Sequence, residues 1–271
     1  MTLLVVVQAR TGSTRLPGKV LLPLAGKPLL GRMLERLRAA KTPFELLVAT
    51  TTDPSDDAVA ETAAAFDTRV YRGHATDLLD RHVGAARHAG ADVVVKIPSD
   101  CPLIAPEVVD RVLGAWLERG VAERLDYLGN LRPPTYPDGN DVEVMPLASL
   151  EVAWCEAKRP FEREHTTPFL WDQPERFRLA NVVWETGLDY SQTHRFTIDY
   201  PEDYALIHAV YAELCTSARP VFSLTDILEL LQARPELLAL NARYHGTSWV
   251  QKHTAELRTR ASLGFHPGVS S

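Results

Sequence analysis

Three cationic side chains lie within ten residues of one another near the start of the chain. Arg10, Arg15 and Lys19 belong to the stretch QARTGSTRLPGK, which also contains Gly12. This stretch follows a short apolar run, residues 3–7, whose β-branched residues and following turn signal predict a buried strand. A loop after a strand presents backbone N–H groups, and with three cations it suits a polyphosphate. An ordinary strand-to-helix turn with solvated charges is the alternative.

Two familiar phosphate-binding motifs do not fit this loop. A Walker loop has four residues between its first glycine and Gly-Lys, followed by Ser or Thr for Mg²⁺. Here five residues separate Gly12 from Gly18, and Val20 follows Lys19. The three-glycine dinucleotide fingerprint is absent. We therefore expect the loop to bind phosphates with its long cationic side chains, and a phosphate-transferring enzyme must then take its metal ligands from elsewhere in the chain.

Two aspartates follow predicted strands and could supply those ligands. Asp100 comes shortly after the predicted strand 92–97, and Asp199 directly after the predicted strand 194–198. Carboxylates at the carboxyl ends of strands face the ligand cleft, and their oxygens are the ligands that Mg²⁺ prefers. Asp100 could instead cap a turn between prolines, and Asp199 could be a helix N-cap with Glu202 completing a capping box. Two aspartates that face one cationic loop are more specific than either alone.

Two further polar clusters are candidates for ligand contacts. The first follows the predicted strand 69–71 and comprises Arg72, Gly73, Asp77, Asp80 and Arg81. The second is the stretch EREHTT, residues 162–167, which would suit a polar substrate pocket. Solvated helix-face charges and an ion-paired helix start are the alternatives. Cys101 is interpreted as a small buried residue rather than a nucleophile, because no histidine is near it in sequence.

The composition is that of an ordinary globular protein, with 271 residues of which 45% are hydrophobic and 24% charged. No apolar run approaches the roughly 20 residues that span a bilayer, and there is no signal-peptide pattern, so we expect a cytoplasmic protein without membrane contact. Cys101, Cys155 and Cys215 are too few and too scattered for a disulfide framework or a zinc site. The first 41 residues hold eight Lys/Arg and one acidic residue, whereas the whole chain has a net charge of −6. This local positive field favours a small anionic ligand and argues against nucleic acid.

Strands and helices alternate four times in the first 120 residues. Predicted strands lie at residues 3–7, 45–50, 69–71 and 92–97, and predicted helices at residues 28–40, from Pro54 to 66, 76–88 and 106–119. The alternation predicts an α/β fold with a mainly parallel central sheet and helices on both faces. Such sheets bind ligands at the carboxyl ends of their strands.

The alternation breaks after Gly120. We expect a nucleotide-binding half, residues 1–120, and an inserted mixed α+β lobe, residues 131–190, that binds the acceptor or forms a dimer contact. Predicted lobe elements are strands at 141–144 and 177–183 and helices at 148–158 and 162–171. Helices at 201–215, 225–234 and 235–244 complete a single domain over residues 1–245. A polar C-terminal tail, residues 246–271, follows, and we expect its last ten residues to be loosely held.

Several short motifs carry a resemblance to a known family. The opening QARTGSTRLPGKVL resembles that of the spore-coat polysaccharide cytidylyltransferases, which are related to the acylneuraminate cytidylyltransferases and the CMP-Kdo synthetases. The similarity covers about residues 3–240 and continues through VATTT, DLLDR, DCPLI, YPDGxDVEV, EREHxTP and DxPED. One departure is Pro98-Ser99 before Asp100, where the family usually has Thr-Gly.

The resemblance implies a nucleotide-diphospho-sugar transferase (Rossmann-like) fold and transfer of CMP from CTP to an acceptor, with release of pyrophosphate. It implies that the nucleotide is bound by Gln8, Ala9, Arg10, Gly12, Ser13, Arg15, Lys19, Arg72, Asp77, Arg81 and Asp100. The implied catalytic residues are Arg15, Lys19, Asp100 and Asp199, with Mg²⁺ bound by the two aspartates. The residues expected around the acceptor are Arg132, Asp138, Asp141, Glu143, Arg163, Glu164 and His165.

No motif identifies the acceptor. Neighbouring families activate acidic sugars, so a carboxylate-bearing sugar is the first expectation, with a CMP-activated product for surface polysaccharide or related biosynthesis. The resemblance also implies a homodimer. A glycosyltransferase of the same fold and a non-catalytic nucleotide-binding protein are the alternatives. Such glycosyltransferases often carry an Asp-x-Asp motif, whereas Asp100 is followed by Cys101-Pro102.

Overall fold

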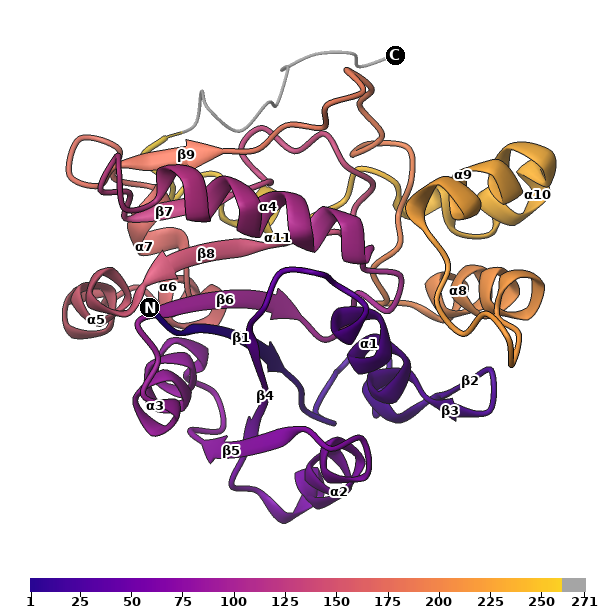
Figure 1. The fold of residues 1–271 in the computed structure, drawn as a ribbon, viewed down its shortest axis with the longest axis horizontal. Coiled ribbons are helices and arrows are strands. Elements are labelled where there is room, and N and C mark those ends of the chain that lie inside the picture. Colours follow the sequence, from indigo (N-terminus) through magenta and orange to yellow (C-terminus); the bar gives the residue numbers. More distant parts are fainter. Residues whose placement is uncertain (260–271) are drawn as a thin grey trace.

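A seven-stranded mixed sheet with helices on both faces forms the centre of the molecule in the computed structural model, which describes residues 1–259 (Figure 1). The strand order is β5-β4-β1-β6-β8-β7-β9. The strands are β1 (Leu3–Gln8), β4 (Glu45–Thr51), β5 (Arg69–Gly73), β6 (Val93–Pro98), β7 (Tyr127–Gly129), β8 (Glu143–Pro146) and β9 (Leu179–Asn181). A two-stranded hairpin, β2 (Pro23–Leu24) and β3 (Lys27–Pro28), stands apart from this sheet. The α/β fold with a mainly parallel sheet is confirmed.

The parallel half of the sheet is made by β5, β4, β1 and β6. Its central strand β1 is buried from Leu3 to Val7 and alternates between two cores, because successive side chains point to opposite faces. Val5 and Val7 pack in one core, and Leu4 and Val6 in the other. All four strands point the same way, so the residues that follow them meet at one carboxyl edge.

The other half of the sheet is mixed. β8 is antiparallel to β6 and to β7, and β9 is parallel to β7. The short strand β7 was not predicted. The strand predicted at residues 194–198 is wrong: this segment forms one isolated bridge, Asp138 with Arg195, and the Ile198 N–H donates to the Asp100 carbonyl instead. These bonds draw the segment to the carboxyl edge rather than into the sheet.

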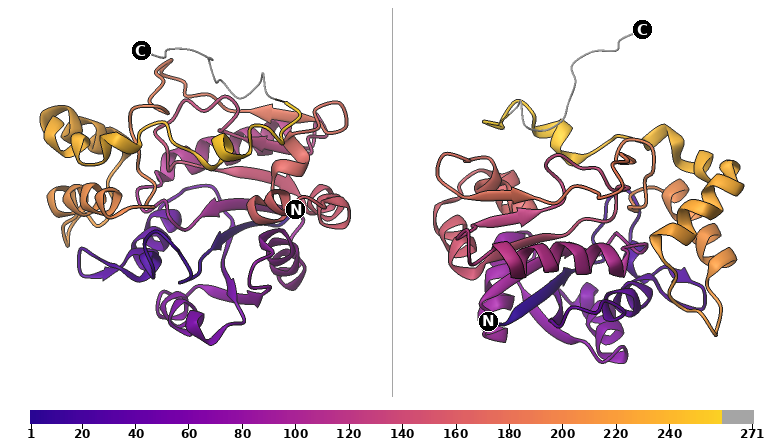
Figure 2. Two further views of the ribbon diagram at one scale, coloured as in Figure 1. Left: turned by 180° about the vertical axis from the view of Figure 1, so that it is seen from behind. Right: turned by 45° about the horizontal axis from the view of Figure 1, so that its top comes forward.

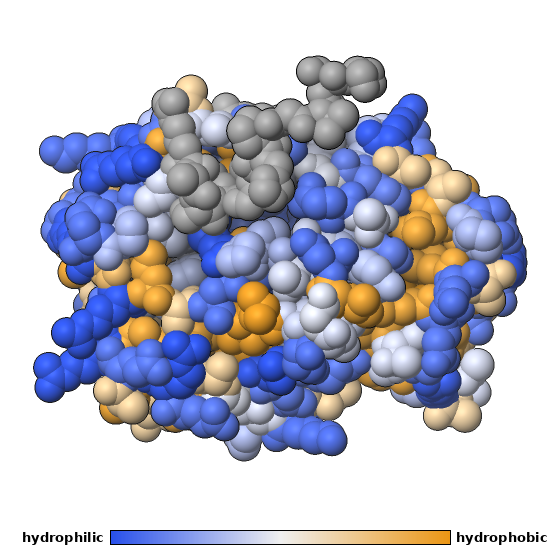
Figure 3. All heavy atoms as spheres, turned by 90° about the horizontal axis from the view of Figure 1, so that it is seen from above, coloured by the Kyte–Doolittle hydropathy of each residue, from blue (hydrophilic) through white to orange (hydrophobic). Residues whose placement is uncertain are grey.

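The helices separate into three groups. One face of the sheet packs against α1 (Leu29–Arg38), α2 (Asp57–Ala65) and α4 (Pro106–Arg119). The other face packs against α3 (Leu78–Ala89), α5 (Leu147–Glu156), α6 (Pro160–His165), α7 (Pro168–Trp171) and α11 (Trp249–His253). A third core holds α8 (Pro201–Leu214), α9 (Leu224–Ala233) and α10 (Pro235–Leu238). Three 3₁₀ turns are η1 (Lys19–Leu21), η2 (Pro54–Asp56) and η3 (Ala239–Tyr244). Seen from above, apolar side chains gather between charged ones at the α9 and α10 end (Figure 3).

The single helix predicted at residues 162–171 is two helices, α6 and α7. They are separated at Thr166, whose φ of 73° and ψ of −52° belong to a γ-turn that non-glycine residues rarely adopt. The Thr167 N–H donates across it to the His165 carbonyl at 2.9 Å. Backbone strain of this kind gathers at ligand-binding sites, and this turn lies in the stretch expected around the acceptor.

Part of the predicted polar tail is folded. α11 lies within it, and Val250 and Leu257 are buried in the core beneath α3, α5, α6 and α7. The expectation of a loosely held C-terminus falls on residues that lie outside those described. The division into a nucleotide-binding half and an inserted lobe stays a prediction. Within residues 1–259, no helix has the length and apolar character needed to cross a membrane.

Candidate active site

The loop that follows β1 is fixed at the carboxyl edge by a buried carboxylate. Asp56 Oδ1 accepts the Thr11 N–H at 2.7 Å and the Thr11 hydroxyl at 2.8 Å, while its Oδ2 accepts from Thr51 at the end of β4. The Gly18 N–H donates back to the Thr11 carbonyl, and Gly18 has a φ of 66°, which glycine adopts without strain. The loop is therefore closed on itself before Lys19 opens η1.

Lys19 joins the two predicted metal ligands. Its Nζ donates to Asp100 Oδ2 at 2.8 Å, to Asp199 Oδ1 at 3.1 Å and to the Ile198 carbonyl at 2.5 Å. Burial alone would lower the pKa of Lys19, but the charges of Asp100 and Asp199 outweigh burial and raise it. The lysine is thus held as a cation between two carboxylates that are 99 residues apart in sequence.

A second set of cations surrounds Asp199. Arg15 forms an ion pair with Asp199 Oδ1, and Arg195 donates to Oδ2 at 2.9 Å. Burial would raise the pKa of Asp199, but Lys19 and Arg15 more than offset it and hold the pKa below its usual value. Asp199 is not the N-cap of α8, as one alternative had it. Tyr200 occupies that position, and Asp203 accepts the N–H groups of Asp199 and Tyr200.

Arg195 is a residue of the candidate site that the sequence patterns did not indicate. Its side chain is buried and reaches three carboxylates, those of Asp138 (3.1 Å), Asp199 (2.9 Å) and Asp203 (3.1 Å). The available signal was its position four residues before Asp199 and eight before Asp203. The sequence predicts an extended strand there. In an extended strand the side chains of Arg195, Asp199 and Asp203 would be too far apart to meet.

Two arginines on the nucleotide side have no carboxylate within ion-pair distance among the described residues. Arg10 Nη1 lies 3.4 Å from the Ala75 carbonyl, and the same carbonyl accepts Arg81 Nη2 at 2.9 Å. Burial, together with the neighbouring charge of Arg10, lowers the pKa of Arg81 to about 10. Gln8 Oε1 is also buried at the end of β1, and no hydrogen-bond donor among the described residues reaches it. The two arginines could therefore bind an anion, and the Gln8 oxygen could accept a hydrogen bond from a ligand.

The other nucleotide candidates have structural partners. Arg72 donates to the carbonyls of Thr51 and Asp53 and pairs with Asp57, so it fixes the turn after β4. Asp77 caps α3 and forms an ion pair with Arg163 at 2.5 Å. Ser13 Oγ accepts the Leu16 N–H at 3.3 Å, within the loop. Ala9 is buried, and Gly12 is exposed.

A model of the cytidylyltransferases matches residues 4–234. The chain belongs to this family. Its members transfer CMP from CTP, so the chain is a nucleotidyltransferase, and the resemblance drawn from the motifs is confirmed. The match also favours this activity over a glycosyltransferase of the same fold.

Relatives of this cytidylyltransferase include one solved structure of high similarity. A cytidylyltransferase from Leptospira borgpetersenii shares 32% identity and a TM-score of 0.82, covering 92% of this chain and 98% of its own. The spore coat polysaccharide biosynthesis protein SpsF of Bacillus subtilis is 30% identical over 86% of this chain and 95% of its own length. A 3-deoxy-manno-octulosonate cytidylyltransferase of Geobacter sulfurreducens is 36% identical over 44% of this chain and 46% of its own length.

The donor set of this cytidylyltransferase fits Mg²⁺ only together with the nucleotide. Within residues 1–259, no group of three or more His, Cys, Asp or Glu side chains could hold a metal ion. Asp100 and Asp199 nevertheless converge on one ammonium group. Mg²⁺ is commonly bound through one or two carboxylates, with phosphates and water as its other ligands. We therefore expect metal binding to depend on the triphosphate.

The acceptor candidates of the cytidylyltransferase include an acidic pair, Asp138 and Asp141, close to Asp100 and Asp199. Burial and Asp141 raise the pKa of Asp138 despite its ion pair with Arg195. Burial raises the pKa of Asp141 to about 6, with Glu143 adding to the shift and Lys96 opposing it. Neighbouring carboxyl groups with raised pKa values can accept hydrogen bonds from sugar hydroxyls without carrying full charge.

Glu143 lies deeper than this pair. It is buried at the start of β8, pairs with Lys96 at 2.5 Å and accepts from Tyr127 at 2.8 Å and from Thr167 at 2.6 Å. Burial would raise the pKa of Glu143, but Lys96 outweighs it and the pKa is lowered. Beside it, Arg132 Nε is buried and has no hydrogen-bond partner within residues 1–259. In the acidic pair, Asp138 is paired with Arg195, whereas the charge of Lys96 acts on Asp141.

Of the remaining acceptor candidates, two make contacts with other helices and one is exposed to solvent. Arg163 donates to Asp77 and to the carbonyls of Trp154 and Ala157, and so ties α3, α5 and α6 together. Glu164 is exposed. His165 stacks on Trp249 with ring centroids 3.6 Å apart. Arg163 is thus less available to a sugar carboxylate than the motif suggested.

His82 is a buried histidine beside this acceptor side. Its Nδ1 contacts the Leu78 carbonyl at 2.7 Å, and its Nε2 is buried with no hydrogen-bond partner in the part of the chain that the structure describes. Burial, reinforced by the charges of Lys96 and Arg81, lowers its pKa to about 3. The unfolded chain therefore takes up the proton first. The contribution of neutral His82 to the free energy of unfolding is complete above pH ~6.5. Below that pH it falls by about 1.4 kcal/mol per pH unit.

We expect His82→Asn to remove this part of the acid sensitivity. Urea unfolding measured between pH 4 and 8 should show a shallower loss of stability for the variant than for the parent chain. His208→Asn is the control, because His208 is exposed. Parallel pH curves for His82→Asn and the parent chain would contradict the buried neutral state.

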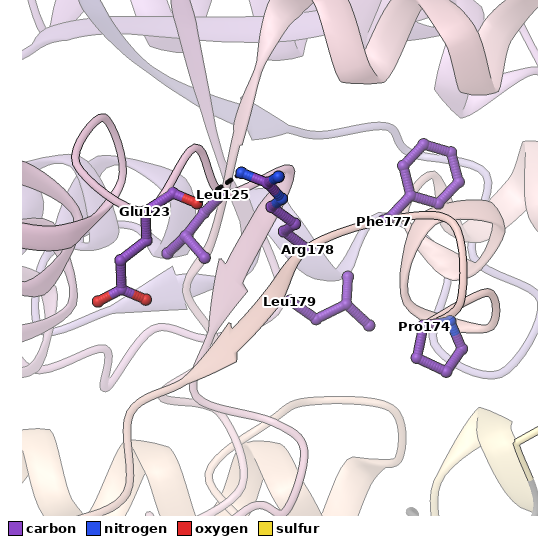
Figure 4. A pocket seen from close by; sticks show the side chains of 6 residues that line it. All are labelled: Glu123, Leu125, Pro174, Phe177, Arg178 and Leu179. Carbon is purple, nitrogen blue, oxygen red and sulfur yellow. Dashed lines mark hydrogen bonds between the residues drawn. The ribbon is translucent and has the colours of Figure 1, made fainter.

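A surface pocket beside β7 and β9 lies away from all of these residues. Its lining residues are Glu123, Leu125, Pro174, Phe177, Arg178 and Leu179 (Figure 4). They precede or begin β7 and β9, and β7 runs antiparallel to β8, as β6 does. The pocket is therefore at the amino edge of the sheet, opposite the carboxylates of the cytidylyltransferase site.

Proposed function

We propose that the chain transfers CMP from CTP to a hydroxyl group of a carboxylate-bearing sugar in a Mg²⁺-dependent reaction. The products are a CMP-activated sugar, for surface polysaccharide or related biosynthesis, and pyrophosphate. One observation carries the proposal: Lys19 and Arg15 both form ion pairs with Asp199, and Lys19 also pairs with Asp100. The acceptor class is supported by the 3-deoxy-manno-octulosonate cytidylyltransferase among the relatives.

The residues of the chain supply positioning and charge. Arg10, Arg15 and Lys19 would bind the triphosphate, and Lys19 and Arg15 would stabilise the charge that develops on the leaving pyrophosphate. The acceptor oxygen forms a bond to the α-phosphorus as the bond between the α-phosphorus and the bridging oxygen breaks, and the hydroxyl proton passes to solvent. Mg²⁺ held by Asp100 and Asp199 would neutralise phosphate charge and make the acceptor hydroxyl more acidic.

Arg132 and Lys96 are the cations that we assign to the acceptor carboxylate. Among residues 1–259, Arg132 Nε has no hydrogen-bond partner and Lys96 has Glu143 as its only ion-pair partner. Asp138 and Asp141 would accept hydrogen bonds from the sugar hydroxyls. Homodimer formation and a cytoplasmic location stay predictions.

Pyrophosphate release tests the proposal. The protein is incubated with Mg²⁺, each of the four ribonucleoside triphosphates in turn, and pools of acidic sugars, sugar phosphates and small phosphonates. We expect release with CTP and a sugar-acid pool. Release with another pool would replace the acceptor class, and CTP binding by calorimetry without release from any pool would support a non-catalytic nucleotide-binding protein.

A further inference from the structure

The C-terminal segment 246–259 lies beyond the part of the chain that the family model matches, residues 4–234. It is nevertheless folded against the body of the protein. Seen from behind, it crosses the sheet face from the α9 and α10 end toward α6 and α7, with α11 at its middle (Figure 2). We call residues 246–259 the C-terminal strap.

The start of the C-terminal strap touches the candidate metal site through one residue. The Thr247 carbonyl accepts Arg195 Nη1 at 3.1 Å. Arg195 in turn donates to Asp199 and Asp138, each within about 3 Å. The strap therefore begins one side chain away from a carboxylate expected to bind Mg²⁺ and from one expected at the acceptor.

The middle of the strap contacts one acceptor candidate directly and lies near a second through the ring of Trp171. Trp249 stacks on His165 with centroids 3.6 Å apart and rings 12° from parallel. Trp249 also packs beside Trp171, with centroids 6.2 Å apart, and the Arg132 guanidinium lies over the Trp171 ring at 3.2 Å. Trp249 is half-buried, so part of its ring faces solvent.

The end of the strap is fastened by a fully buried carboxylate. Asp172 accepts the Arg258 N–H at 2.9 Å, and the N–H and hydroxyl of Thr259 at 2.9 and 2.8 Å. Arg159 also donates to the Glu256 carbonyl at 2.6 Å. Hydrogen bonds to a buried charged group are stronger than average, so this end resists detachment.

We propose that the C-terminal strap forms one side of the acceptor site, with Trp249 as a positioning residue that holds His165 in place for the acceptor. The inference rests on the proposed function. Its physical basis is pre-organisation: a histidine already fixed by stacking loses less freedom when the acceptor binds. Within residues 1–259, the hydrogen bond that links the strap to Asp199 runs from the Thr247 carbonyl through Arg195, and Trp249 takes no part in it. Trp249 therefore contributes to acceptor binding and not to CTP binding.

The test compares three full-length variants with the parent chain. For Trp249→Ala we expect the acceptor KM to rise about tenfold, the size expected when an ordered side chain must be fixed anew on binding. The CTP affinity measured by calorimetry stays within about twofold. Trp249→Phe keeps a stacking ring and should restore most of the acceptor affinity. Leu117→Ala, which truncates an exposed apolar side chain of α4 outside the strap, is the control and should behave like the parent chain.

The outcomes separate this inference from the proposed function. An unchanged acceptor KM in Trp249→Ala, or equal losses of acceptor and CTP affinity, would overturn the positioning role while leaving cytidylyl transfer in place. A parent chain that releases no pyrophosphate with any acceptor pool would overturn the proposed function and this inference together.

Discussion

Replacing Asp100 with Asn is expected to lower kcat on the order of 10³-fold, the effect of losing several kcal/mol of metal-assisted charge stabilisation. Asp100 has few structural partners: the side chain accepts Lys19 Nζ at 2.8 Å and contacts the Cys101 thiol at 3.7 Å. Asn keeps the shape and one acceptor oxygen, so thermal unfolding should be almost unchanged. Pyrophosphate release and the Mg²⁺ concentration at half-maximal rate measure the effect.

Asp92→Asn is the control for this variant because it makes the same change at the opposite end of β6. Asp92 is largely exposed and pairs with the chain's first residues, so its loss should leave the rate within about twofold of the parent chain. Full turnover by Asp100→Asn in Mg²⁺ would refute the metal-binding role. A large drop in its thermal stability would assign Asp100 to the fold instead.

The parallel half of the fold could be predicted from local sequence because β1, β4 and β6 are short, mainly apolar runs followed by a turn. The helix predicted at residues 106–119 has the bounds of α4, with Pro106 at its first turn. The loop expected to bind phosphate was equally local, since Arg15 and Lys19 are close in sequence. Asp100 became a candidate because it follows such a strand, and its role stays a prediction.

The mixed half could be predicted only in part: the strands predicted at 141–144 and 177–183 overlap β8 and β9, whereas β7 was missed. β7 has only three residues, and it is held by pairing with β8 and β9 rather than by its own pattern. Thr166 adopts its strained conformation while Thr167 donates to the buried Glu143. The polar composition of the tail likewise hid the partners of Trp249 and of the backbone at Arg258, which lie in α6 and after α7.

Arg195 shows most clearly why local patterns fail at the site. Its role depends on Asp138, Asp199 and Asp203 arriving together, and no spacing between Asp138 and Arg195 reports that contact. We expect Arg195→Met to destabilise the protein by about 3–5 kcal/mol, because three carboxylates lose a shared buried partner. This corresponds to a fall in Tm on the order of 10 °C. Arg111→Met removes an exposed ion pair with Glu185 and should cost less than about 1 kcal/mol.

The conservative variant separates stability from positioning. Arg195→Lys keeps one charge but lacks the planar fork that reaches three carboxylates and the Thr247 carbonyl. Arg195→Lys should recover part of the stability that Arg195→Met loses. Because Asp199 still lacks its fixed orientation, we expect kcat to be below that of the parent chain and the Mg²⁺ concentration at half-maximal rate to be higher. Denaturant unfolding and Mg²⁺ titration of the rate measure the two effects. Recovery of both together would mean that Arg195 supports the fold alone, whereas recovery of stability without rate makes it the residue that orients the metal carboxylate.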